Sequence, residues 1–175
     1  MIEVLSSQYV YRGHIVKLRI DQTRLANNHI INAEVVDHAG AVAVVALDAE
    51  NRVLLARQYR FGAGKELLEI PAGTLEKSED PALCATRELK EETGYSALQL
   101  QYLGHYYSTP GFCNEDMHIY LAQQLTPGQT HFDRDEEIKT EKISLDQAVA
   151  MIERGEITDG KTIIGLLRVW KMLHG

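Results

Sequence analysis

A continuous run of seven apolar residues, 41–47, constrains the fold of this chain more than any other segment. The run is short and rich in valine, which is typical of a β-strand that is buried on both faces. A turn at residues 48–51 leads into a second expected strand at 53–59. The first strand therefore predicts a layered core, because each of its two faces needs apolar neighbours.

Other strands are expected before and after this pair. Residues 4–37 contain alternating apolar and polar positions and a turn at 27–29, which together predict an N-terminal antiparallel β-sheet. Further strands are expected at 98–107, 116–122 and 137–143.

Three helices complete the expected architecture. One begins near Asp80, with Pro81 in its first turn, and ends at Gly94, which tolerates a left-handed conformation. A capping-box pattern at 144–147 opens a second helix, and residues 161–173 form a closing amphipathic helix. Strands interleaved with few helices predict a chain of the α/β class, folded as an α/β/α sandwich with a mixed sheet.

Length, charge and cysteine content narrow the possible functions. The 175 residues suffice for a single domain with one core, and the net charge of −7 argues against nucleic acid as a partner. The apolar runs are too short to span a membrane and the first residues lack a signal-peptide pattern, so we expect no membrane association. The two isolated cysteines, Cys84 and Cys113, favour a reducing, cytoplasmic location.

The first expected helix carries a concentration of acidic residues. Glu88 and Glu92 lie one turn apart on the same edge of this helix. Two like charges at this spacing destabilise a helix by about 0.2–0.5 kcal/mol. A divalent cation held by oxygen ligands reverses the sign of that interaction. The spacing therefore predicts a magnesium-type site among the acids of this segment, which are Glu79, Glu88, Glu91 and Glu92.

The same segment resembles the Nudix box, which is written G-x5-E-x7-R-E-U-x-E-E-x-G-U, with U an apolar residue. The match has no gap and comprises Gly73, Glu79, Arg87, Glu88, Leu89, Glu91, Glu92, Gly94 and Tyr95. Resemblance to the Nudix hydrolase family implies an α/β/α sandwich and hydrolysis of a nucleoside diphosphate linked to a second group. It also implies Mg²⁺ or Mn²⁺ as the cofactor, and we expect one to three ions per site.

The resemblance also suggests roles for individual residues. Glu88 and Glu92 are expected as metal ligands, and the carbonyl of Ala72 is implied as a further ligand. Glu91 faces Arg87, four residues earlier on the helix. It is therefore a candidate both for metal binding and for catalysis, with a structural ion pair as the alternative.

Segments outside the box resemble the ADP-ribose pyrophosphatase branch of the family. Pro110 lies fifteen residues after Tyr95, within a segment, 107–115, where that branch carries a proline. A simple Pro-Gly turn is the alternative explanation. Arg60, in the sequence Arg57-Gln-Tyr-Arg60, is implied to contact the phosphates of the substrate, and a surface ion pair is the alternative.

An acidic stretch at 133–138 resembles a loop of related enzymes whose glutamate acts as the base or as a third metal ligand. Aligned on Ile138, Glu136 takes that position and Glu137 is the second candidate. A solvated loop without a catalytic role is the alternative. Glu115 is a further carboxylate that we expect to line the substrate pocket.

In similar enzymes, an N-terminal β-sheet exchanges between subunits and completes the nucleoside pocket. We therefore expect a homodimer built from a single Nudix hydrolase domain, 1–175. Within it, residues 1–38 are expected to form the dimerisation region and residues 39–175 the Nudix fold.

The sequence as a whole predicts a Mg²⁺-dependent pyrophosphatase of nucleoside diphosphate sugars. ADP-ribose is the leading substrate, with AMP and ribose 5-phosphate as products. Hydrolysis of GDP-mannose or another nucleoside diphosphate hexose is the main alternative, because the same box serves both. A ligand-binding regulator on the same scaffold is disfavoured by the complete set of box carboxylates, and an RNA pyrophosphohydrolase is disfavoured by the acidic net charge.

Overall fold

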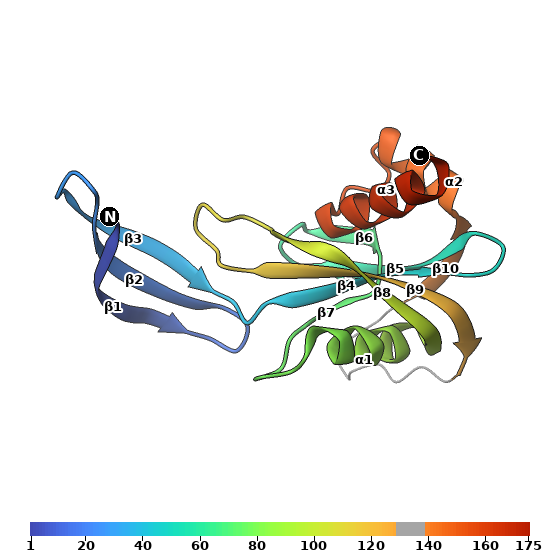
Figure 1. Cartoon of the computed structure of the whole chain (residues 1–175), viewed down its shortest axis with the longest axis horizontal. Coiled ribbons are helices and arrows are strands. Elements are labelled where there is room, and N and C mark those ends of the chain that lie inside the picture. The colour runs from blue at the N-terminus through green and yellow to red at the C-terminus, as the bar shows by residue number, and fades with distance from the viewer. Residues whose placement is uncertain (129–138) are drawn as a thin grey trace. The chain divides into compact units, whose positions relative to one another are not determined.

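A computed structural model describes residues 1–128 and 139–175, and these form two compact units (Figure 1). The N-terminal unit comprises Met1–Gly40 and Tyr106–Asp116. The core unit comprises Ala41–His105 and Met117–Gly175.

The N-terminal unit is built on a three-stranded antiparallel sheet. Its strands are β1 (Glu3–Arg12), β2 (Lys17–Arg24) and β3 (Ile30–Asp37), in the order β1-β2-β3. This sheet confirms the expectation drawn from residues 4–37. The segment Tyr106–Asp116 joins β3 through the backbone, where the N–H of Val36 donates to the carbonyl of Phe112 at 2.7 Å.

The core unit contains a seven-stranded sheet. Five strands follow one another in the order β10-β5-β4-β9-β8, while β6 pairs with β5 and β7 pairs with β4. β4 runs parallel to β9 and antiparallel to β5 and β7, so the sheet is mixed, as predicted. The strand bounds are β4 (Ala41–Leu47), β5 (Arg52–Arg60), β6 (Lys65–Glu69), β7 (Ala72–Thr74), β8 (Tyr95–Tyr107), β9 (Asp116–Pro127) and β10 (Lys139–Ser144).

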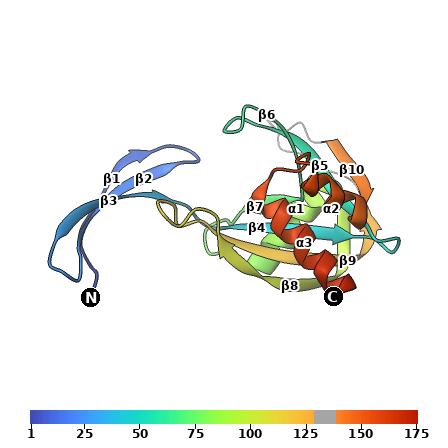
Figure 2. The ribbon, with the colours of Figure 1, turned by 90° about the horizontal axis from the view of Figure 1, so that it is seen from above.

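Helices cover both faces of this sheet. α1 (Pro81–Thr93) lies on one face, and α2 (Leu145–Glu153) and α3 (Gly160–His174) lie on the other (Figure 1 and Figure 2). All seven residues of β4 are buried between these layers, which confirms the doubly buried strand predicted at 41–47. Each helix in the described ranges is too short or too polar to cross a membrane.

Close packing fixes the distance of each helix from the sheet. On the α3 side, a Cβ atom at Gly165 would lie 2.9 Å from Val45 Cγ2 and 3.0 Å from Ile70 Cδ1, so the backbone of α3 rests directly on the sheet. On the α1 side, the helix and the sheet share an apolar cluster. Its buried members are Val42, Val44, Ala46, Leu54, Cys84, Ala85, Leu89, Tyr120 and Ala122.

The sequence does not predict β6 and β7. β7 has three residues, which is too short for an alternating pattern, and it is defined by its pairing with the centre of the sheet. In that pairing Ala72 lies opposite Ala43, and Gly73 lies opposite Val42. The pairing matters for function, because it places the residues that precede the acidic helix next to the most buried strand.

Candidate active site

Helix α1 begins and ends where the sequence predicts. The side chain of Asp80 caps its first turn by accepting hydrogen bonds from the backbone N–H of Ala82 at 2.9 Å and of Leu83 at 3.3 Å. Gly94 ends the helix in the left-handed region, with a φ of 73°. The apolar side of α1 packs on the sheet through Leu89 and its neighbours, so the acidic edge meets β7.

The carboxylate of Glu88 lies against the backbone of β7 at Gly73. A Cβ atom at Gly73 would lie 1.9 Å from both Cδ and Oε1 of Glu88, so any other residue here would force that carboxylate to move. Because Gly73 pairs with Val42 on β4, the strand has little room to move away. The glycine at this position therefore leaves the space that the carboxylate from α1 occupies.

Glu92, one turn further along α1, reaches the neighbouring residue of the same strand. Its carboxylate accepts a hydrogen bond from the backbone N–H of Ala72 at 3.2 Å, and 6% of the residue is exposed. Glu88 and Glu92, the two acids predicted to act together, therefore lie against two successive residues of β7, Gly73 and Ala72. Ala72, whose carbonyl the family resemblance implies as a ligand, is one of those two residues.

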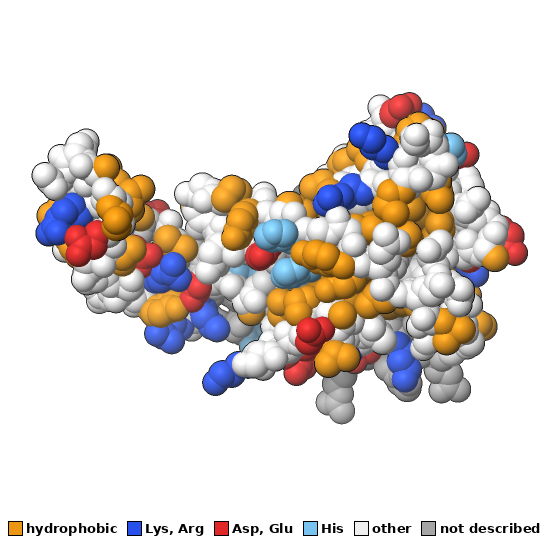
Figure 3. Space-filling model, viewed as in Figure 1, with side chains coloured by type: hydrophobic (Ala, Val, Ile, Leu, Met, Phe, Trp, Pro, Cys, Tyr) orange, Lys and Arg blue, Asp and Glu red, His pale blue; other side chains and the backbone are white. Residues whose placement is uncertain are grey.

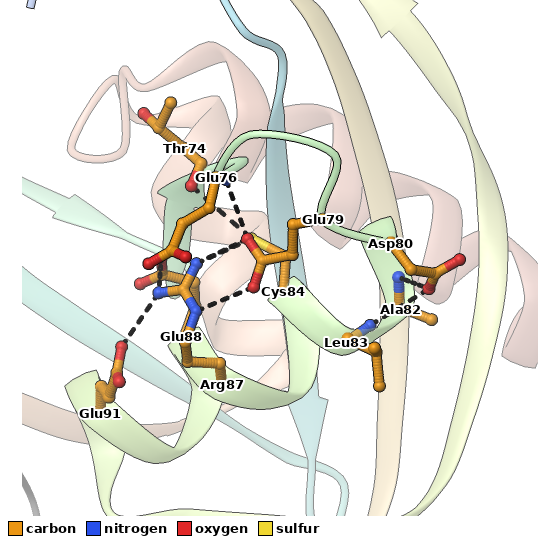
Figure 4. Close-up of polar contacts among 10 residues, drawn as sticks. All are labelled: Thr74, Glu76, Glu79, Asp80, Ala82, Leu83, Cys84, Arg87, Glu88 and Glu91. Atoms are coloured by element: carbon orange, nitrogen blue, oxygen red, sulfur yellow. Dashed lines mark hydrogen bonds and ion pairs between the residues drawn. The ribbon is translucent and has the colours of Figure 1, made fainter.

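Arg87 binds three of the four acids of this segment (Figure 4). Its Nε and Nη2 donate to the two carboxylate oxygens of Glu79, both at 3.0 Å. Its Nη1 donates to Glu88 at 2.6 Å and to Glu91 at 3.1 Å. We call these four residues the Arg87 cluster. The ion pair between Arg87 and Glu91, which the sequence left as one of two alternatives for Glu91, is present, and Arg87 also pairs with Glu79 and Glu88.

These contacts shift the pKa values of the groups involved. Hydrogen bonds from Arg87 and from the backbone N–H of Glu76 lower the pKa of Glu79 from 4.5 to about 2. The bond to Glu79 in turn raises the pKa of Arg87. Burial raises the pKa of Cys84, whose Sγ lies 3.2 Å from Arg87 Nη2, to about 12. At neutral pH the cluster therefore holds an ionised Glu79 beside a neutral thiol.

The site carries an excess of negative charge. With Glu92 added, the Arg87 cluster has four carboxylates and one guanidinium, so its formal charge is −3. Oxygen donors of this kind suit hard divalent cations such as Mg²⁺. Within residues 1–128 and 139–175, no three His, Cys, Asp or Glu side chains form a metal-binding group. A cation at Glu88 and Glu92 therefore needs further donors, such as a backbone carbonyl, water or the substrate.

Arg60, the residue expected to contact phosphate, lies at the end of β5 and forms an ion pair. Its Nε and Nη2 donate to Glu69 at 2.9 Å and 2.8 Å. The partner is not a surface residue, because 2% of Glu69 is exposed. Burial raises the pKa of Glu69, but Arg60 and Lys161 outweigh that effect and hold the pKa below its usual value.

The sequence does not identify Glu69 and Lys161 as partners. Lys161 Nζ binds Glu69 Oε2, and the two residues lie 92 positions apart in the chain. One signal was available, because Glu69 stands between Leu68 and Ile70 in an apolar stretch. A carboxylate in such a stretch is buried with the strand and then requires a cationic partner.

Of the remaining predicted residues, one belongs to the N-terminal unit, two lie outside the described part of the chain, and Glu91 belongs to the Arg87 cluster. Glu115 belongs to the N-terminal unit, where its Oε1 lies 3.7 Å from Nε2 of His38. Glu136 and Glu137 lie outside the described residues. Glu91 binds Arg87 and keeps 43% of its side chain exposed.

The lowered pKa of Glu79 predicts a specific dependence of stability on pH. The Glu79–Arg87 pair stabilises the fold above about pH 4.5, and this contribution is lost as the pH falls from about 4.5 to about 2. We expect Glu79→Gln to lower the melting temperature at neutral pH and to flatten its decline across that window. Thermal melts of both proteins, with Glu76→Gln as the charge-matched control, measure the effect. Parallel pH profiles for Glu79→Gln and the wild type would contradict the prediction.

Comparisons with known proteins agree with this geometry. Residues 37–164 match the family model described as NUDIX domain. The chain is 39% identical to the methanol dehydrogenase activator of Bacillus methanolicus, over 94% of this chain and 90% of that protein. It is 35% identical to the ADP-ribose pyrophosphatase of Bacillus subtilis (strain 168), over 91% and 88%.

A solved structure shows the same fold. The crystal structure of an ADP compounds hydrolase covers 99% of this chain, and the match spans 95% of that protein, with a TM-score of 0.86 and 23% identity. The acidic edge of α1 meets β7, and the family model matches most of the chain. The chain belongs to the Nudix hydrolase family and resembles the ADP-ribose pyrophosphatases within it.

Proposed function

We propose that this Nudix hydrolase cleaves the pyrophosphate bond of nucleoside diphosphate sugars, with ADP-ribose as the leading substrate and AMP and ribose 5-phosphate as products. The observation that carries the proposal is the meeting of Glu88 and Glu92 at β7. Pyrophosphate hydrolysis needs an attacking water, a proton acceptor and neutralisation of phosphoryl charge. Carboxylates clustered along helix α1, two of them against β7, support these needs.

Nudix proteins generally use divalent metal ions. For this chain we propose Mg²⁺ or Mn²⁺, with one to three ions per site. Glu88, Glu92 and the carbonyl of Ala72 would hold the first ion, and Glu91 is a further candidate ligand. When bound, such an ion neutralises charge on the phosphoryl oxygens and activates water. Arg87 holds Glu88 and Glu91 in position through charge-assisted hydrogen bonds.

Other residues are proposed to bind the substrate and to move the proton. Arg60 donates hydrogen bonds to Glu69 through Nε and Nη2, so its Nη1 takes no part in that ion pair. We propose that this Nη1 binds a phosphoryl oxygen. Glu115 is proposed to contact the substrate, and Glu136, with Glu137 as second candidate, is proposed as the general base.

We further propose a homodimer formed through residues 1–38. Every residue of β1 is exposed or half-buried in the single chain, and apolar side chains stay exposed on this sheet (Figure 3). On the strands they are Val4, Val10, Tyr11, Ile30 and Ile31, and beside the strands they are Ile2, Ile15 and Val16. Apolar exposure of this extent indicates a covered surface in the native assembly. Light scattering after gel filtration is expected to give the mass of two chains, and the mass of one chain would exclude the dimer.

The proposed activity is tested by incubating the pure protein with Mg²⁺ and separate nucleotide sugars. We expect AMP to be released from ADP-ribose faster than GMP from GDP-mannose, and chelation of the metal to stop both reactions. Faster cleavage of GDP-mannose would favour the alternative substrate class. Absence of nucleoside monophosphate with every nucleotide sugar in the panel would refute the proposal.

A second candidate function is activation of another enzyme, which the name of the Bacillus methanolicus relative suggests. This function has a different readout, because the rate of a methanol dehydrogenase would rise when the protein is added. Activation that persists in a variant unable to cleave nucleotide sugars would separate this role from hydrolysis.

The contact between Gly73 and Glu88 predicts the effect of a single methyl group. Gly73→Ala would place a Cβ atom on the Glu88 carboxylate, so that side chain must leave its position. We expect kcat for ADP-ribose to fall at least about a hundredfold, because a shift of about 1 Å in a catalytic group has effects of this size. Gly62→Ala is the matched control, since its Cβ meets no atom within 4 Å. Full activity in Gly73→Ala, with the same fold by circular dichroism, would contradict the assignment of Glu88.

A further inference from the structure

Glu69 is a buried carboxylate that binds two cations. Arg60 forms two hydrogen bonds with it, at 2.9 Å and 2.8 Å, and Lys161 binds Glu69 Oε2. The side chain of Glu69 is 3% exposed and that of Lys161 is 12% exposed. Arg60 alone would balance the charge of Glu69, so Lys161 brings a second positive charge to this carboxylate, and another acid must balance it.

Lys161 is held too firmly to act on a ligand directly. Its Nζ binds Glu69 and also lies 3.0 Å from Oδ1 of Asp159. Asp159 is the N-cap of α3, where its other oxygen accepts a hydrogen bond from the backbone N–H of Thr162 at 3.0 Å. Any effect of Lys161 on the active site therefore passes through Glu69 and its partner Arg60.

Arg60 connects this group to the acidic site. Its side chain is 39% exposed, so it reaches solvent while Glu69 is buried. The bond to Glu69 raises the pKa of Arg60 most, and the charges of Glu92 and Asp159 raise it further. The field of Glu92, the acid that binds the backbone of β7, therefore acts on the Arg60 guanidinium.

The charge balance of this group depends on Lys161. Arg60 and Lys161 carry two positive charges, and Glu69 and Asp159 carry two negative charges, so the four residues are formally neutral. Without Lys161, the group would carry one net negative charge, and the field of Glu92 on Arg60 would add to it. An anionic diphosphate approaching Arg60 would then meet a guanidinium that is fully offset by carboxylates.

We infer that Lys161 is a positioning residue for the diphosphate of the substrate. By sharing Glu69 with Arg60, Lys161 leaves the positive charge of Arg60 able to attract a phosphoryl oxygen. Glu69 at the same time fixes the orientation of the guanidinium through two parallel hydrogen bonds. The inference rests on the proposed function, because it takes a nucleoside diphosphate as the ligand.

The first test removes the charge and keeps a hydrogen-bonding side chain. Lys161→Gln is expected to raise KM for ADP-ribose about tenfold, because one unit charge is lost near a doubly charged ligand. It is expected to change kcat less than about threefold, since Lys161 does not touch the reacting atoms. Lys161→Arg, which keeps the charge, is expected to retain the wild-type KM. Calorimetric titration with ADP, in Mg²⁺, measures the same loss of affinity without hydrolysis.

A double variant separates charge from structure. Asp159→Asn combined with Lys161→Gln returns the group to neutrality and keeps a side chain that can cap α3, so its KM is expected to lie within about threefold of the wild-type value. Lys171→Met is the matched control, because it removes one positive charge from the same helix α3 at an exposed position. We expect no change in KM for this variant.

Two results would overturn the inference. One is an unchanged KM and an unchanged Kd for ADP in Lys161→Gln. The other is a double variant that binds ADP more weakly than Lys161→Gln, which would assign Lys161 to the fold alone. Because the titration with ADP needs no turnover, it reports on Lys161 even if ADP-ribose is not hydrolysed. Failure of the proposed function and failure of this inference are therefore distinguishable.

Discussion

The contact between the Glu88 carboxylate and Gly73 is the constraint on which the site depends. Helix α1 and strand β7 belong to different layers, and they can touch at this distance because Gly73 has no side chain. The depth of α1 is set by Leu89 and the rest of its apolar cluster, and the register of β7 is set by its pairing with β4. Packing of the core therefore determines where the carboxylate lies, and a small error in either layer would move it.

Arg87 offsets the repulsion among the carboxylates that lie beside α1. Three carboxylates brought together beside one helix would repel one another and raise their own pKa values. A guanidinium can bind all three at once because its donors point in fixed directions, which a lysine ammonium cannot match. Even so, the four carboxylates of the site outnumber the single guanidinium. The cluster is thus rigid and still negative, which is the condition that favours a divalent cation.

The parts of this site that sequence predicts are those set by local rules. The ends of α1 follow from Asp80 and Gly94, and the pairing of Glu88 with Glu92 follows from helical periodicity. Strand β7 has no such rule, because three residues become a strand only through β4. The pair of Glu69 with Lys161 spans 92 positions, so its existence depends on how α3 packs on the sheet. Glu136 and Glu137 remain predictions, since they lie outside the described residues.

The Arg87 cluster is one set of buried or half-buried ion pairs in this chain. The other set joins Arg60, Glu69, Asp159 and Lys161. Removal of one partner of such a pair, as in Glu79→Gln, destabilises the fold, but the whole pair adds little net stability, because the cost of removing charges from water is close to the attraction regained. Apolar side chains of similar size would often stabilise the fold more. The benefit of these ion pairs lies in preorganisation, since groups already fixed in orientation need not rearrange when a charged ligand binds. In this chain the fixed groups are Arg60 and Glu88. Glu69 orients Arg60, a cation that can attract an anionic ligand. Arg87 orients Glu88, an anion that can attract a divalent cation.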